Sequence, residues 1–172
     1  MSNLRLINET LITSAVSTVS VTDVFSADFD IYKITLSKLL TSAENYQNYR
    51  FINSSGSVVT ASNYDSATLF MGSSTAFSEE RYTNQSYGRN WIYQDDNQGG
   101  VGTFYIFNPF SSNSYSFVLA QASSFRDTTP QAYSTKYISV LKQTASMTGI
   151  NFNASSNILN IRARIYGLRV DS

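Results

Sequence analysis

The end of the chain carries the pattern that most restricts the fold. Between 160 and 166 the residues alternate between apolar and polar, and the chain then closes on Gly167-Leu168. A period of two places successive side chains on opposite faces of a β-strand. We therefore expect this segment to cover a core with one face and to expose Arg162 and Arg164 on the other. As the clearest strand comes last, it is expected to complete a sheet whose neighbouring strand would otherwise be unpaired.

The rest of the chain has the chemistry of β-strands. Aromatic residues make up 14% of it, with 12 Tyr, 11 Phe and one Trp, and they stand among β-branched residues and short turns of Ser, Asn and Gly. Strands are expected at 30–39, 49–51, 58–59, 89–94, 101–108, 115–122 and 136–142, with one or two more in 4–21. Two short strands are expected after 147, around the polar turn Ala154-Ser155-Ser156-Asn157. For 64–70 a short helix is an alternative.

These elements predict an all-β protein with about eight to ten short strands. The sequence contains no helix long enough for a crossover between parallel strands. The strands should therefore pair antiparallel, in a sandwich of jelly-roll type. At 172 residues, one domain spanning 1–172 is expected. Residues 1–22 should form an extended N-terminal arm or an edge strand.

The charge balance and the missing residue types exclude several functions. Twelve Lys and Arg offset twelve Asp and Glu, so nucleic acid is not expected as a partner, and a lightly charged surface favours association with other subunits. Apolar runs are short, which predicts no membrane span and no signal peptide, so the protein is expected to be made in a cytoplasm. With no Cys and no His, the usual metal ligands and general bases are missing. We expect no enzyme and no cofactor.

Two sets of acidic residues are candidates for sites of chemistry. Asp95-Asp96-Asn97 stands before two glycines and offers oxygen ligands for calcium, but the spacing matches no defined calcium loop and a solvated turn is favoured. Glycoside hydrolysis needs two carboxyl groups across a sugar ring, for which Glu79, Glu80, Asp95 and Asp96 are the candidates. Few acids and no visible means of tuning their pKa values argue against it. No metal or catalytic residue is predicted.

Two sets of residues are predicted to bind a partner. The segment 82–93 mixes aromatic rings with small polar residues, as recognition surfaces do, and could bind protein or sugar. Its candidates are Tyr82, Tyr87, Arg89, Trp91 and Tyr93. The alternative is that these aromatics fill the core. Arg162 and Arg164 could pair with carboxylates of a neighbouring subunit, and the alternative is a solvated face.

Several short motifs resemble, in order, the small β-domains of structural proteins in tailed bacteriophages. They are Tyr32-Lys33-Ile34-Thr35, Asn53-Ser54-Ser55-Gly56, Phe107-Asn108-Pro109, Met147-Thr148-Gly149-Ile150-Asn151-Phe152 and Ile165-Tyr166-Gly167-Leu168. The resemblance spans roughly 30–168. It implies a component of the virion with a jelly-roll fold that acts as a symmetric oligomer, and it brings no catalytic residues.

These observations lead to two hypotheses of function. The favoured one is a capsid decoration (cement) protein, a homotrimer that binds other virion proteins, chiefly the major capsid protein, and stabilises the shell. No coiled-coil shaft is visible, which favours it over a fibre. The alternative is a tail-fibre or receptor-binding protein that recognises a host surface glycan through the segment 82–93.

Overall fold

Eleven antiparallel strands make up the part of the chain that the computed structural model describes, which is 4–74, 77–94, 98–127 and 130–168. They are β1 (Leu4–Ile12), β2 (Val16–Val21), β3 (Ile31–Thr41), β4 (Asn45–Asn53), β5 (Tyr64–Gly72), β6 (Ser78–Gln85), β7 (Gly88–Gln94), β8 (Gly100–Phe107), β9 (Ser116–Arg126), β10 (Gln131–Leu141) and β11 (Met147–Leu168). The described residues contain no helix. The all-β, antiparallel prediction is confirmed, but the predicted eight to ten strands were too few.

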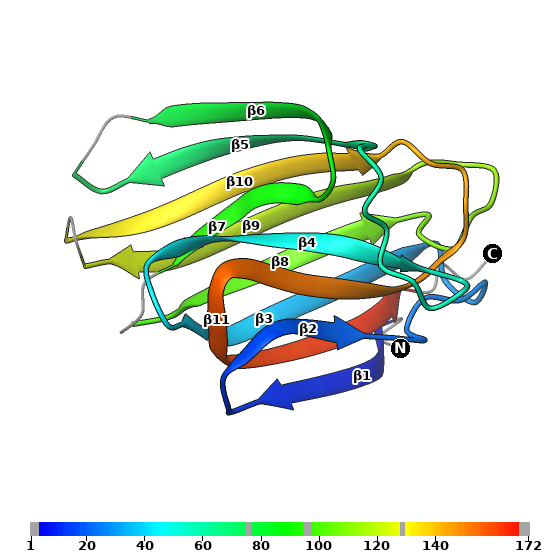
Figure 1. Cartoon of the computed structure of the whole chain (residues 1–172), viewed down its shortest axis with the longest axis horizontal. Helices are drawn as coiled ribbons and strands as arrows, with labels where there is room; N and C mark the ends of the chain where they lie inside the picture. The colour runs from blue at the N-terminus through cyan, green and yellow to red at the C-terminus, as the bar shows by residue number, and fades with distance from the viewer. Residues whose placement is uncertain (1–3, 75–76, 95–97, 128–129, 169–172) are drawn as a thin grey trace.

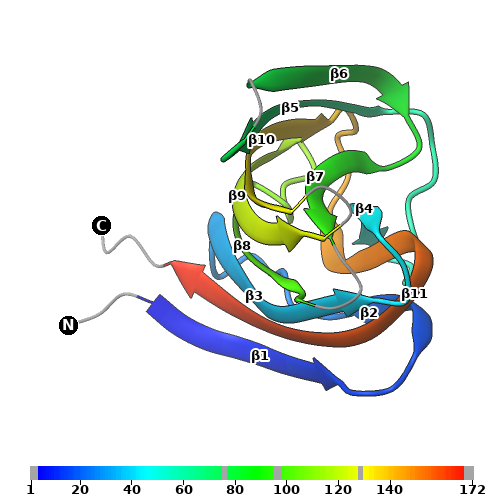
Figure 2. The ribbon, with the colours of Figure 1, turned by 90° about the vertical axis from the view of Figure 1, so that its left-hand side faces the viewer.

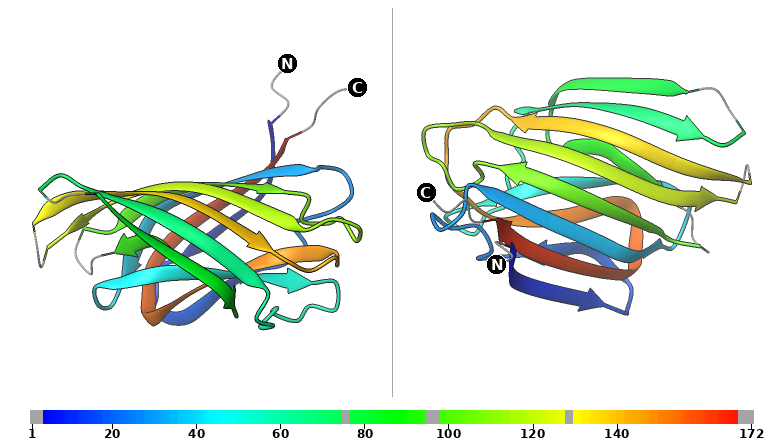
Figure 3. Two further views of the ribbon diagram at one scale, coloured as in Figure 1. Left: turned by 90° about the horizontal axis from the view of Figure 1, so that it is seen from above. Right: turned by 180° about the vertical axis from the view of Figure 1, so that it is seen from behind.

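The strands form one hydrogen-bonded sheet that folds over on itself. Its order is β6-β5-β10-β9-β8-β3-β11-β4-β7, with β1 and β2 each paired to β11. A broad layer runs from β6 to β3 and continues through the second half of β11 to β1, as seen from behind in Figure 3. In front of it lie β7, β4, the first half of β11 and β2 (Figures 1 and 2). The wrapping is nearly barrel-like, and jelly-roll connectivity stays a prediction.

β11 joins the two layers because it bends in its middle. Residues 147–154 pair with β4 and β2 in front, whereas 158–168 pair with β3 and β1 in the broad layer. The pairing with β2 shifts register between Asn153 and Ile158. The predicted turn at 154–157 therefore is a bend inside one 22-residue strand, as occurs where strands change layers at the corner of a sandwich, and the prediction of two separate strands was wrong.

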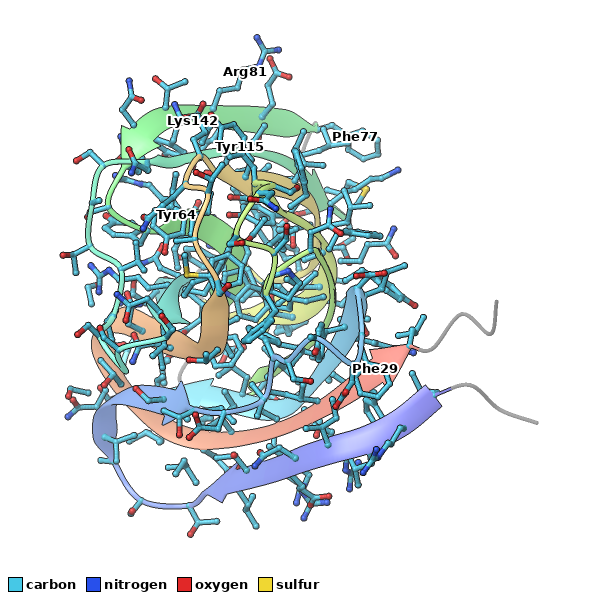
Figure 4. All side chains as sticks on the ribbon, turned by 90° about the vertical axis from the view of Figure 1, so that its right-hand side faces the viewer. Phe29, Tyr64, Phe77, Arg81, Tyr115 and Lys142 are labelled. Carbon is cyan, nitrogen blue, oxygen red and sulfur yellow. The ribbon has the colours of Figure 1, made fainter. Side chains whose placement is uncertain are left out.

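Aromatic side chains from both layers fill the space between them. Phe104 of β8 lies with its ring centroid 4.6 Å from that of Trp91 on β7 and 5.8 Å from that of Tyr49 on β4. Both pairs meet edge to face, the arrangement that ring quadrupoles favour. Tyr64 of β5 lies in the same interior (Figure 4), and its hydroxyl accepts a hydrogen bond from the Phe51 backbone N–H.

The other strand predictions differ in outcome. Strands expected at 30–39, 89–94, 101–108, 115–122 and 136–142 are confirmed within a few residues, as β3, β7, β8, β9 and β10. The hairpin after residue 51 is confirmed in part, because Gly56 has a φ of 78° and Val58 forms an isolated bridge with Ile52. The alternative helix at 64–70 was wrong, since these residues belong to β5. β6 was not predicted at all.

Candidate functional site

The predicted segment 82–93 lies on β6 and β7, which are the end strands of the sheet order. Arg89 of β7 places its guanidinium carbon 4.4 Å from the ring centroid of Tyr82 on β6. Tyr87 carries Arg50 over its ring in the same way, and Tyr93 carries Arg126. All three tyrosines are half-buried. The structure thus brings Tyr82 and Arg89 together and covers the ring faces of the segment with arginines of the same chain.

Trp91 is separate from this surface because it is fully buried in the core. Gly102 of β8 lies against the indole, and a Cβ on it would come within 2.9 Å of the ring carbon Cζ3. Gly88 makes similar room for the Tyr49 ring on the neighbouring strand. These close approaches, together with the Trp91 contact to Phe104, are those of a core residue. They favour the core alternative for Trp91.

Arg162 and Arg164 share one carboxylate of their own chain. The Arg164 Nε lies 2.8 Å from Glu9 Oε2, and the Arg162 Nε lies 3.6 Å from Glu9 Oε1. The hydrogen bond from Arg164 holds the pKa of Glu9 below its usual range. These contacts join β11 to the end strand β1. A contact of either arginine with a neighbouring subunit stays a prediction.

The acidic candidates do not assemble into a site. Asp95, Asp96 and Asn97 lie outside the described residues. Glu79 and Glu80 are successive residues of β6 and so point to opposite faces: Glu79 pairs with Arg81 at 2.6 Å, whereas Glu80 accepts a hydrogen bond from the Tyr82 hydroxyl. Among the described residues, no three His, Cys, Asp or Glu side chains come close enough together to hold a metal ion.

A group of exposed apolar residues that the sequence does not predict lies on one face of the sheet. It lies on the outer face of the broad layer, where nothing described covers β5, β10, β9 and β8 (Figure 3, right). We call it the outer apolar stripe. Its residues are Ala67, Tyr105 (37% exposed), Phe117 (46%), Leu119 (48%) and Ile138 (54%).

The stripe arises because β9 places its large apolar residues outward and its small ones inward. Ala120 and Ala122 face the core, where Trp91 and Phe104 already fill the space, while Phe117 and Leu119 face solvent. Apolar outward side chains that are clustered, rather than scattered singly, are typical of a binding surface. A signal was present in the sequence, since an unbroken apolar run at 117–120 is expected of a strand covered on both faces.

Polar groups and a hollow border the stripe. The polar residues beside the stripe are Lys33 on β3, Gln121 on β9 and Lys136 on β10. The Lys33 Nζ lies 5.9 Å from the Tyr105 ring centroid. On the β6 side, a shallow hollow of about 500 Å³ lies between Ala67, Val140 and the ridge made by Leu119 and Ile138. An apolar centre with a polar rim is the anatomy of protein interfaces.

Comparisons with known proteins give no family for this chain. No family model matches it, and no curated protein matches it. Among solved structures, it is similar to the CBM2 module of the evolved Dit of Lactobacillus casei BL23 phage J-1, with 9% identity over 98% of each chain and a TM-score of 0.32. It is also similar to protein SO2946 of Shewanella oneidensis MR-1, with 8% identity over 99% of this chain and 81% of the other, at a TM-score of 0.20. Likenesses this distant carry no assignment.

In the described residues, no helix has the length and hydropathy needed to cross a membrane.

Proposed function

We propose that this chain is a structural protein of a phage particle that binds neighbouring protein subunits through the outer apolar stripe, and that it serves as a decoration protein of the capsid. The observation that carries the proposal is the stripe itself. Leu119 and Ile138 each expose about half of their surface, side by side, in the middle of the broad layer. Burying such surface against another subunit is favourable by roughly 25 cal/mol per Å² of apolar area.

The stripe supports protein as the partner more strongly than sugar. Glycan binding relies on open aromatic faces, but the central pair of the stripe is aliphatic. In the segment 82–93, Trp91 is buried and the rings of Tyr82, Tyr87 and Tyr93 lie under arginines. Each guanidinium occupies one face of its ring, so a sugar that stacks on that face must displace it. This geometry disfavours the glycan hypothesis for that segment.

Such a protein would stabilise a shell by mass action. A ligand that binds only the assembled state lowers the free energy of that state, and it does so by an amount that grows with its concentration and affinity. The protein would perform no chemical turnover. The motifs at 32–35, 53–56, 107–109, 147–152 and 165–168 that resemble phage β-domains of jelly-roll type support a place in the virion, and the stripe supports a contact with subunits.

The proposal predicts that particles lacking this protein are less heat-stable. We expect them to release their genome at a lower temperature than complete particles, as measured by the fluorescence of a DNA-binding dye during heating. Unchanged release temperatures would contradict the decoration role. A glycan array probed with the purified protein serves as the control for the alternative, because specific glycan binding would favour a receptor-binding protein.

A further inference from the structure

We propose that the outer apolar stripe binds a second copy of this chain, giving a face-to-face dimer with two-fold symmetry. This inference rests on the subunit-binding role proposed above and names the first partner of that surface. It differs from the trimer expected from the sequence, because that expectation came from the symmetry of shells, whereas the shape of this face is complementary to itself about a two-fold axis.

One row of the stripe slopes from a large side chain to a small one. Tyr105 of β8 is opposite Leu119 of β9, Leu119 is opposite Ile138 of β10, and Ile138 is opposite Ala67 of β5. The row thus begins with a phenol ring and ends with a methyl group. A flat partner would contact the tall end and leave a gap at the low end.

A second copy removes that gap. A two-fold axis that runs parallel to the strands, between β9 and β10, exchanges β8 with β5 and β9 with β10. Tyr105 then lies over Ala67 of the second copy, and Leu119 lies over Ile138 of the second copy. Each contact occurs twice, as required of an interface that uses the same patch on both partners.

The hollow beside the ridge fits the same arrangement. Its volume is about 500 Å³, and Ala67 contributes to its lining because the short side chain leaves the floor of β5 low. The Tyr105 ring of the second copy enters this space from above. Packing a large residue over a small one is how facing sheets reach the density of a protein interior.

At the two ends of the row, the axis places Lys33 of β3 over Arg81 of β6 in the second copy, because Lys33 is opposite Tyr105 and Arg81 is opposite Ala67. The same axis places β3 over β6 of the second copy, because each of these strands lies next to the exchanged pair of β8 and β5. Lys33 of β3 forms no ion pair with any described residue. Glu79 of β6 is well exposed, beside an Arg81 that points away from the body in Figure 4. Glu79 lies two residues from Arg81 on the same face and pairs with it at 2.6 Å, so its carboxylate offsets the repulsion between Lys33 and Arg81 of the second copy.

The available area suffices for a weak dimer. Six strands, from β3 to β6, span about 24 Å at a spacing of ~4.8 Å, and three pairs of residues along each span about 20 Å. The flat area is therefore on the order of 500 Å² per copy. Two copies would bury on the order of 1,000 Å² in total, which is at the low end of specific interfaces and fits a weak dimer.

Sedimentation of the purified full chain tests the association. We expect wild type to form a dimer at tens of micromolar, and Ile138→Lys to raise the dissociation constant by about 100-fold or more, since it buries two lysines at the centre of the face. Ser17→Lys, at an exposed residue near the start of β2 in the other layer, is the matched control and should leave the dimer intact. Lys33→Glu should strengthen the dimer, because the axis places residue 33 over Arg81 of the second copy, and adding Arg81→Glu should remove that gain.

Cross-linking tests the geometry. The chain has no cysteine, so introduced thiols are the only ones. Thr103 and Leu69 lie in one row and are three strand spacings apart within a chain. The proposed axis places Thr103 of one copy over Leu69 of the second copy. A bismaleimide with a reach of about 8 Å suits sheets that pack ~10 Å apart. With this reagent, a mixture of the Thr103→Cys and Leu69→Cys proteins should cross-link efficiently. Each variant alone should cross-link poorly.

A wild-type protein that stays monomeric at 100 μM, or cross-links that form equally well in all three samples, would overturn the dimer. These outcomes are distinct from failure of the proposed function. If the monomeric protein still restored heat stability to depleted particles, the decoration role would stand while the dimer would fall, and the shell would be the partner of the stripe.

Discussion

Lys38 is an exposed lysine in an unfavourable backbone conformation. Its φ is 54°, in the left-handed region, where a Cβ is crowded by the following carbonyl oxygen. It lies within β3 where the pairing with β8 skips from Leu36 to Leu39. The strain thus accompanies an irregularity that bends the strand between the two halves of its ladder.

We expect Lys38→Gly to stabilise the protein by about 1 kcal/mol, because glycine adopts this conformation without the Cβ penalty. Urea unfolding followed by circular dichroism measures the change. Lys38→Ala is the matched control, since it removes the charge and the long side chain but keeps the Cβ, and it should give no such gain. Equal stabilisation by both variants would show that the charge, not the backbone, is responsible.

Trp91 tests the core alternative at a single residue. It is the only tryptophan of the chain and is fully buried against Phe104. We expect Trp91→Ala to lower the free energy of unfolding by about 3–5 kcal/mol, as removal of a large core side chain does. Tyr87→Ala, at a half-exposed position of the same segment, should cost clearly less. Similar small costs for both would place Trp91 at the surface.

At the scale of elements, strands with a clear apolar pattern could be predicted, and a strand that is polar on both faces could not. β3 and β10 alternate cleanly, so their positions followed from the sequence. β6 was missed because Ser-Glu-Glu-Arg-Tyr-Thr-Asn-Gln is polar on both faces, as suits a strand at the end of a sheet. The sequence predicts a turn at the bend of β11, because a polar tetrapeptide inside a bent strand has the same local composition as a turn between two strands.

The candidate site depended on tertiary information that no strand pattern contains. Alternation in β9 gives two sets of residues but not which set faces the core, and the larger set faces outward because aromatics of other strands occupy the interior. The segment 82–93 was singled out correctly as rich in aromatics. Its division into a buried Trp91 and arginine-covered tyrosines depends on partners from β4, β8 and β9.

The end strand β1 depends on the charge of Glu9. Its carboxylate binds Arg164 and Arg162 of β11, and the hydrogen bond from Arg164 lowers its pKa. A carboxyl group with a lowered folded pKa stabilises the fold above its unfolded pKa of about 4.3, and this contribution is lost as pH falls through the folded value. β1 should therefore loosen before the rest of the sheet on acidification.

Hydrogen exchange measures this loosening. After correction for the intrinsic pH dependence of exchange, we expect the protection of amides in β1 to fall between pH 5 and 3 relative to those of β4, the range in which a glutamate near its usual pKa of about 4.3 titrates. In Glu9→Gln, protection of β1 should be lower at neutral pH and independent of pH over the same range. A pH-dependent β1 in that variant would mean that another group is responsible.

At the scale of the whole molecule, the fold separates an aromatic core from a second apolar face. The core is closed between the two layers, so the outer apolar stripe adds little to the stability of one chain in isolation. Its residues are instead available to a partner. This division explains why a lightly charged chain of zero net charge carries exposed leucine and isoleucine in the middle of its broadest layer.

Adding purified protein back to particles that lack it tests this claim most directly. We predict that wild type restores the temperature of genome release, that Ser17→Lys restores it equally, and that folded Ile138→Lys fails to restore it because a lysine in the stripe cannot be buried against a subunit. Full restoration by Ile138→Lys at the wild-type concentration would contradict the claim that the outer apolar stripe is the binding surface.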